Sequence, residues 1–167
     1  MTLESQEGKA KALVFFTSRY CNTEKISRSL TSGLEEAGIE TVCANAANVP
    51  ADSLRQYDLI CVGAPTEKLT ASQPIKEFLG KLRAIDLSGK FGFAFDTNFH
   101  LLLSGSAAKH IKKELERQGL QIIAPRESAV VFIPKGGKEC DVRLKEGEEK
   151  RFEDAGRHVG LLLAGGR

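Results

Sequence analysis

The sequence predicts a three-layer α/β domain, in which a five-stranded parallel sheet lies between two layers of helices. Short apolar runs, typical of strands buried on both faces, alternate with longer segments whose apolar residues recur at helical spacing. Such alternation is typical of parallel sheets connected by right-handed crossovers. No linker of low complexity interrupts the 167 residues, a length that suits one domain.

The first elements follow a polar start. Residues 1–11 lack an apolar stretch, so we expect a disordered tail before a single domain at residues 12–164. Ala12–Thr17 is a continuous apolar run and predicts the first strand. Thr23–Ala37 carries apolar residues at helical spacing and is followed by Gly38, which favours a helix end. Ile39–Ala44 predicts the second strand.

The middle of the chain repeats this alternation. Asn45–Gln56 reads as a loop with one helical turn after Pro50. Leu59–Val62 is an apolar strand, and Pro74 suits the first turn of the helix that follows it. Phe91–Phe95 predicts the fourth strand.

The last third predicts two helices around a divided strand. Ser104–Gln118 is the first helix, and Gly147–Ala164 is the second, although Gly156 and Gly160 each weaken a helix by roughly 1 kcal/mol relative to Ala. The fifth strand is predicted in two pieces, Gln121–Ala124 and Ala129–Ile133. Pro134–Asp141 reads as a glycine-rich turn.

Composition excludes several classes of function. Hydrophobic residues make up 41% of the chain and charged residues 28%, which fits a folded domain. The longest apolar runs hold roughly five residues, far short of the ~18 that span a bilayer, so no membrane segment is expected. The net charge is +2 without a basic half, so we expect no nucleic-acid partner.

The four cysteines form no C-x-x-C pair, and the three histidines lack the spacing of metal ligands. We therefore expect no metal site and a reducing, cytoplasmic environment. Cys43 and Cys61 lie in apolar runs, where cysteine behaves as a small core residue.

Ligands of open parallel sheets bind outside the carboxyl ends of the strands. This rule selects three loops, Thr17–Asn22, Gly63–Thr70 and Asp96–Gly105. The first leads directly into a helix N-terminus, which favours a phosphate because free N–H groups and the helix dipole point there. Neither G-x-G-x-x-G nor G-x-x-x-x-G-K-[ST] is present, which argues against a dinucleotide site and a P-loop.

These segments resemble the flavodoxin family. Ser18-Arg19-Tyr20-Cys21-Asn22-Thr23 is similar to its phosphate loop, serine-x-[Thr/Tyr]-Gly-Asn-Thr. Tyr57–Thr66 resembles the third strand and the loop that lies against the flavin ring. Lys90–Phe99 occupies the place of the third flavin-contacting loop. The resemblance extends from about Lys11 to Ala164.

The resemblance implies a flavodoxin-like sandwich with strand order 2-1-3-4-5. It also implies noncovalent binding of FMN and electron transfer, in which the flavin cycles between oxidised and reduced states and no side chain is a catalyst. The implied partner is a redox protein or a small-molecule electron acceptor. The cofactor-binding residues that it implies are Thr17, Ser18, Arg19, Tyr20, Cys21, Asn22, Thr23, Ala64, Pro65, Thr66, Glu67, Asp96, Thr97, Asn98 and Phe99.

Cys21 departs from the family pattern, because it stands where the phosphate loop has glycine. If this position needs a positive φ, cysteine is strained there. Two interpretations stay open. Cys21 is either a small neutral replacement for glycine or a reactive thiol, since a helix N-terminus lowers a thiol pKa.

Two other functions stay open. One is an FMN-dependent NAD(P)H or quinone oxidoreductase of the same fold. The other is an interaction module that has kept the fold and lost the cofactor. The chain has no tryptophan, so Phe99 is the best candidate to stack on a flavin, followed by Tyr20 and His100. Leu101–Leu103, if exposed, would suit a partner, a homodimer contact or a hydrophobic substrate.

Overall fold

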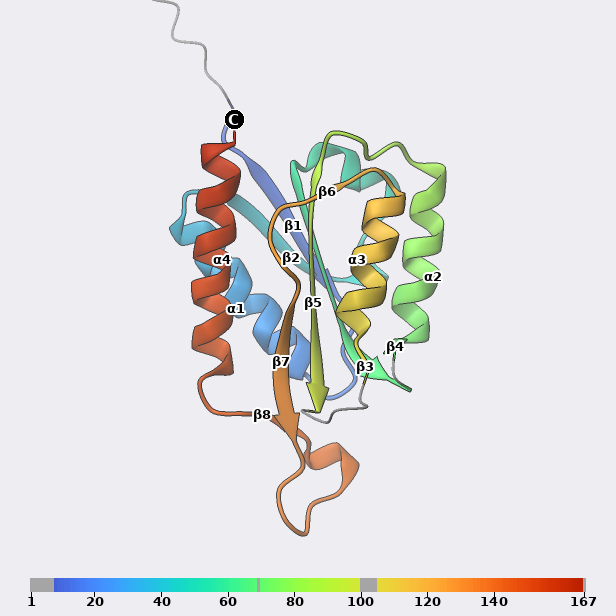
Figure 1. Cartoon of the computed structure of the whole chain (residues 1–167), viewed down its shortest axis with the longest axis vertical. Coiled ribbons are helices and arrows are strands. Elements are labelled where there is room, and N and C mark those ends of the chain that lie inside the picture. Colours follow the sequence, from blue (N-terminus) through green and yellow to red (C-terminus); the bar gives the residue numbers. More distant parts are fainter. Residues whose placement is uncertain (1–7, 69, 100–104, 167) are drawn as a thin grey trace, which may run out of the picture.

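The computed structural model describes residues 8–68, 70–99 and 105–166. Most of the predicted tail, His100 and Leu101–Leu103 lie outside these ranges, so the predictions made for them stay predictions. In the described part, the long strands are parallel and follow the spatial order β2-β1-β3-β5-β7 (Figure 1), which confirms the predicted order 2-1-3-4-5. These strands are β1 (Lys11–Phe16), β2 (Glu40–Asn45), β3 (Leu59–Glu67), β5 (Phe91–Phe99) and β7 (Glu127–Phe132).

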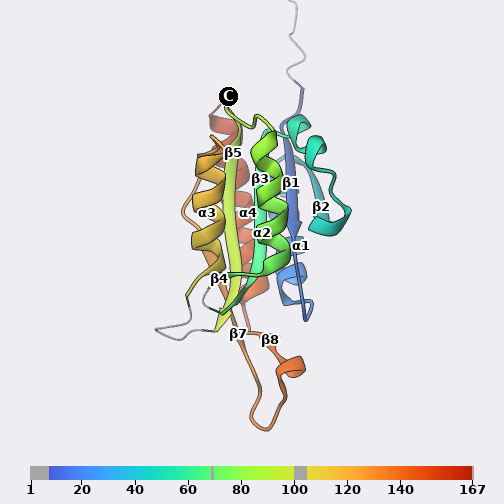
Figure 2. The same cartoon turned by 90° about the vertical axis from the view of Figure 1, so that its right-hand side faces the viewer.

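Helices cover both faces of the sheet, as the three-layer prediction requires (Figures 1 and 2). α1 (Asn22–Glu36) and α4 (Glu148–Gly165) cover one face, where Ile26, Leu30 and Phe152 join its core. α2 (Gln73–Lys81) and α3 (Ala107–Arg117) cover the other. Among the described helices, none combines the length and apolar character that crossing a bilayer requires. Short 3₁₀ helices complete the connections: η1 (Ala46–Asn48), η2 (Ala51–Gln56), η3 (Leu82–Ala84) and η4 (Glu139–Asp141).

The sheet differs from the sequence prediction at its carboxyl edge. β3 and β5 continue beyond Val62 and Phe95, because Ala64 pairs with Asp96 and the next residues pair in turn. Two two-residue strands are added: β4 (Thr70–Ala71) antiparallel to β3, and β8 (Arg143–Leu144) antiparallel to β7. The predicted strand piece Gln121–Ala124 is present as the shorter β6 (Gln121–Ile122), parallel to the start of β5. The sheet is therefore parallel in its centre and mixed where the two hairpins form.

α1 and α4 approach each other through glycines. A Cβ on Gly156 would lie 2.1 Å from the Leu30 carbonyl oxygen, and one on Gly33 would lie 2.0 Å from the Glu153 carbonyl oxygen. Real Cβ atoms do not approach backbone oxygens so closely, so both positions require glycine. Glycine at position 156 lowers the intrinsic stability of α4 relative to alanine, and the close packing of the two helices offsets this cost.

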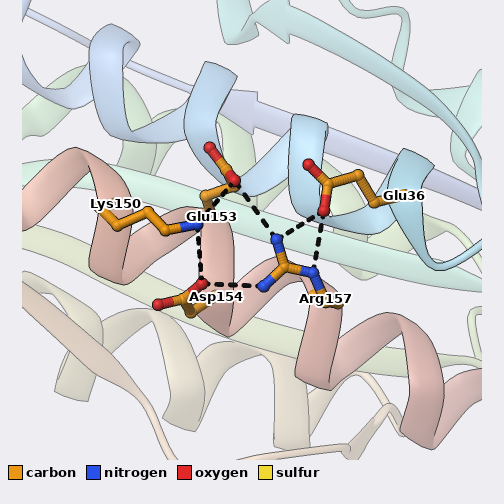
Figure 3. A network of polar contacts seen from close by, with 5 residues as sticks. All are labelled: Glu36, Lys150, Glu153, Asp154 and Arg157. Carbon is orange, nitrogen blue, oxygen red and sulfur yellow. Dashed lines mark hydrogen bonds and ion pairs between the residues drawn. The ribbon is translucent and has the colours of Figure 1, made fainter.

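An ion-pair network joins the same two helices on their outer side (Figure 3). The Arg157 guanidinium of α4 donates to Glu36 of α1 over 2.9 Å from Nε and to Asp154 over 2.8 Å. Lys150 lies 3.1 Å from Glu153 and 3.3 Å from Asp154. The contacts to Glu36 are the part of this network that crosses between the helices.

Gly156→Ala should lower the free energy of unfolding by about 2–4 kcal/mol, because the new methyl group forces α1 and α4 apart. The matched control is Gly80→Ala in α2, where a Cβ would meet nothing within 4 Å. That control should stabilise the protein by up to ~1 kcal/mol. Urea unfolding of the two variants measures both effects, and an equal effect of the two would contradict the packing argument.

Candidate functional site

The described parts of the three selected segments meet at the carboxyl edge of the sheet. The Thr17 N–H donates to the Gly63 carbonyl over 3.1 Å, which ties the β1–α1 loop (17–21) to β3. A cavity of about 90 Å³ opens where the N-terminus of α1 faces the ends of β3 and β5. Its lining residues are Ser18, Arg19, Tyr20, Asn22, Thr23, Pro65, Thr66, Glu67, Thr97, Phe99, Val131, Glu139 and Val142.

The β1–α1 loop aims the first turn of α1 at this cavity. Cys21 is the residue before the helix and has φ 64°, the left-handed conformation that favours glycine. Its side chain makes no capping hydrogen bond, and the first N–H groups of a helix have no partner within it. The Ser18 hydroxyl oxygen is buried and has no hydrogen-bond partner among the described residues. The loop therefore presents uncommitted donors, and these suit an anion.

Two further contacts fix the start of α1 against the sheet and the last hairpin. The hydroxyl groups of Thr23 and Thr97 lie 3.1 Å apart and are buried. The Asn22 amide donates to the Val142 carbonyl over 3.0 Å. Asn22 and Thr23 thus line the cavity with side chains that already have partners in the protein.

Asp96 lies outside the cavity lining, although it was predicted to contact a cofactor. Its carboxylate is fully buried and accepts hydrogen bonds from the Ser106 hydroxyl (2.8 Å), the Ala108 N–H (2.9 Å) and the Thr66 hydroxyl (3.2 Å). It therefore joins the start of α3 to β3, and the second oxygen has no partner among the described residues. The Asn98 amide likewise turns to the Gly105 carbonyl.

The remaining predicted residues divide between the cavity and its surroundings. The hydroxyl groups of Thr17 and Ser72 are hydrogen-bonded, with their oxygens 3.0 Å apart. Thr17 lines a neighbouring groove of about 350 Å³, which is also lined by Ser18, Arg19, Pro65 and Glu67. Ala64 is part of the core beneath α2 and α3. Glu67 precedes Lys68, whose φ of 46° marks the turn between β3 and β4. Phe99 is 37% exposed at the cavity.

One wall of the cavity was not predicted from the sequence, and it comes from β7 and from the segment between β7 and β8. We call residues 133–142 the β7–β8 hairpin loop. Glu139 lies 3.3 Å from the Arg19 guanidinium, and Val142 accepts the bond from Asn22. Gly136 and Gly137 signal a turn here, but no local pattern shows that it reaches residues about 120 positions earlier.

The four cysteines have different environments. Cys61 is buried in the core, where burial raises its pKa far above the usual range, and burial also raises the pKa of the half-buried Cys43. Cys21 and Cys140 are exposed. Among the described residues, no group of three or more His, Cys, Asp or Glu side chains is arranged to hold a metal ion.

Comparison with known proteins places this geometry in a family. Residues 14–154 match the sequence model of flavodoxins. A solved structure of a flavodoxin from the domain Archaea superposes with a TM-score of 0.77 and 20% identity, covering 92% of this chain and 99% of that one.

Two curated relatives are longer proteins. An uncharacterized protein of Methanocaldococcus jannaschii is 27% identical over 154 residues, which cover 89% of this chain and 37% of that protein. A nitric oxide reductase of Moorella thermoacetica is 25% identical over 134 residues, which cover 78% of this chain and 33% of that protein. The chain thus spans little more than a third of the curated relatives that it matches.

Cys21→Gly should raise the free energy of unfolding by about 0.5–1 kcal/mol, because glycine relieves the left-handed strain while adding some unfolded-state entropy. Cys21→Ala keeps the Cβ and should give no such gain. Urea unfolding of both variants tests the conformation at this residue, and equal stabilities for glycine and alanine would show that Cys21 is not strained.

Proposed function

The chain belongs to the flavodoxin family, and on that basis we propose that it binds FMN noncovalently and carries electrons between redox partners. The cofactor lies, in this proposal, at the carboxyl edge of the sheet between the β1–α1 loop and the ends of β3 and β5. The partner is a redox protein or a small-molecule acceptor that reaches this edge.

The observation that carries the proposal is the Ser18 hydroxyl beside the N-terminus of α1, which is buried without a partner in the part of the chain that the structure describes. A buried hydroxyl without a partner costs free energy, and a phosphate oxygen would supply the missing hydrogen bond. The uncapped first turn of α1 offers N–H groups and a positive dipole end to the same ligand. Arg19 adds a formal positive charge at the rim. The donor set therefore fits the phosphate of FMN.

The residues at the ends of β3 and β5 fit the flavin ring. Pro65 and Thr66 form one side of the cavity, and Thr97 and Phe99 form another. When bound, FMN supplies the electron-accepting and electron-donating chemistry, so the chain needs no catalytic side chain of its own. What these residues do is hold the ring, limit water around it and set the charge near it. Glu67 places a carboxylate at the cavity with no ion-pair partner among the described residues.

A second candidate, an FMN-dependent NAD(P)H or quinone oxidoreductase, is favoured by the adjacent groove of about 350 Å³. Four residues line both this groove and the cavity, so a second molecule there would lie next to the flavin. FMN-dependent oxidation of NAD(P)H by the purified protein distinguishes this candidate from a carrier, which requires a separate protein to reduce it.

Titration of the purified protein with FMN, followed by flavin fluorescence, should give saturable binding in the micromolar range or tighter. Ser18→Ala should weaken FMN binding by about tenfold, because a hydrogen bond to a charged group is lost. The control is Ser29→Ala, a half-buried residue of α1 whose hydroxyl donates to the Lys25 carbonyl of the same helix, and it should leave affinity unchanged. The absence of binding at high FMN would refute the proposal.

Glu67→Gln should raise the midpoint potential for full reduction of bound FMN by tens of millivolts, because a negative charge near the ring opposes added electrons. Potentiometric titration of the FMN complex measures this shift. An unchanged potential would mean that the Glu67 carboxylate is too far from the ring or too well solvated to act on it.

A further inference from the structure

The β7–β8 hairpin loop is an ordered unit with its own hydrogen bonds. Gly137 donates from its N–H to the Pro134 carbonyl over 2.8 Å, and Lys138 donates from its N–H to the Asp141 carboxylate over 2.7 Å. At its base, the Val130 N–H donates to the Glu148 carboxylate over 2.7 Å. Figure 1 shows the loop extending beyond the ends of the strands. These hydrogen bonds hold the residues of the loop in a fixed arrangement relative to one another.

This loop forms contacts with side chains that would otherwise be available to the phosphate of FMN. Its Glu139 carboxylate pairs with Arg19, and its Val142 carbonyl accepts the amide of Asn22. Burial and the neighbouring Glu139 carboxylate also raise the pKa of Tyr20, whose ring lies under the Arg19 guanidinium at 5.2 Å. The hairpin loop thus contacts residues on both sides of Cys21, namely Arg19 in the β1–α1 loop and Asn22 at the start of α1.

The cavity is also small for a flavin. Its volume of about 90 Å³ lies below the ~300 Å³ that small-molecule sites usually offer. Glu139 and Val142, together with Val131, form the wall that closes it on the hairpin side. A ligand of the size of FMN therefore has to displace part of this wall or extend past it.

We infer that the β7–β8 hairpin loop competes with the phosphate of FMN for Arg19, and that Glu139 thereby weakens the binding of phosphate-bearing flavins and leaves that of riboflavin unaffected. The inference rests on the proposed function. Arg19 and Glu139 are 59% and 67% exposed, and exposed pairs of this kind are weak. A phosphate dianion that also meets the α1 N–H groups can replace Glu139, whereas riboflavin, which has no phosphate, cannot.

Glu139→Gln tests the competition directly. It should tighten FMN binding by about fivefold at low ionic strength and leave riboflavin binding unchanged, because both the competing pair and the repulsion of phosphate are removed. Glu35→Gln is the charge-matched control, since Glu35 is exposed on α1 and lies ~20 Å along the helix from Asn22. That variant should change neither affinity. A Glu139→Gln variant that binds FMN more weakly or equally, or that tightens both flavins alike, would overturn the inference.

Inorganic phosphate separates this inference from the proposed function. Phosphate should raise the melting temperature of Glu139→Gln by more than that of the wild type, whether or not FMN binds. The pKa of Tyr20 should also fall in this variant, which an ultraviolet pH titration would report as proof that Glu139 lies beside Tyr20 in solution. If FMN does not bind but phosphate still stabilises Glu139→Gln more than the wild type, the proposal that FMN is the cofactor is refuted. The proposal that Glu139 competes with phosphate is then supported. Equal responses of both proteins to phosphate would refute the competition.

Discussion

The left-handed turn at Cys21 is the constraint on which the site depends. It allows β1 to end beside β3 and lets α1 begin at once, so the helix points its free N–H groups at the ends of β3 and β5. A residue with a β-region φ would direct α1 elsewhere and separate it from Ser18 and Thr97. Cysteine accepts this conformation at a cost that glycine would avoid. The position of the site thus follows from one backbone angle and from the parallel order of the strands.

The packing of α1 against α4 maintains that geometry. Gly33 and Gly156 bring the two backbones into contact, and Arg157 joins their outer sides through Glu36. Because the proposed phosphate site lies at the N-terminus of α1, the position of this helix decides whether its first N–H groups face the cavity. Gly33 in α1 and Gly156 in α4 each weaken an isolated helix, but their close packing helps to position the N-terminal end of α1.

Much of the fold could be predicted because its signals are local. Apolar runs such as Ala12–Thr17 and helical repeats such as Thr23–Ala37 gave the elements to within one or two residues. β3 and β5 were predicted too short, since Gly63, Pro65 and Asn98 are residues typical of loops. Their pairing with neighbouring strands overrides that preference. The sequence also could not show that Asp96 would be turned toward α3 rather than the cavity.

The hairpin contact was beyond prediction for a different reason. Arg19 and Glu139 are far apart in the chain, and their pairing depends on how β7 and β8 direct the loop between them. In the proposed function, this contact gives Arg19 two alternative anionic partners, the Glu139 carboxylate and the phosphate of FMN. On this proposal, the charge of a ligand, and not its ring alone, decides whether the ligand can replace Glu139 at Arg19.

Phosphorus NMR of the protein mixed with FMN tests the central claim most directly, because it reports on the phosphate itself. The account predicts a phosphate resonance displaced from that of free FMN and insensitive to pH near neutrality, since hydrogen bonds from Ser18 and α1 would hold the phosphate as a dianion. A resonance that titrates as in free FMN, under conditions where the flavin is bound, would show that the phosphate lies in solvent and would contradict the account.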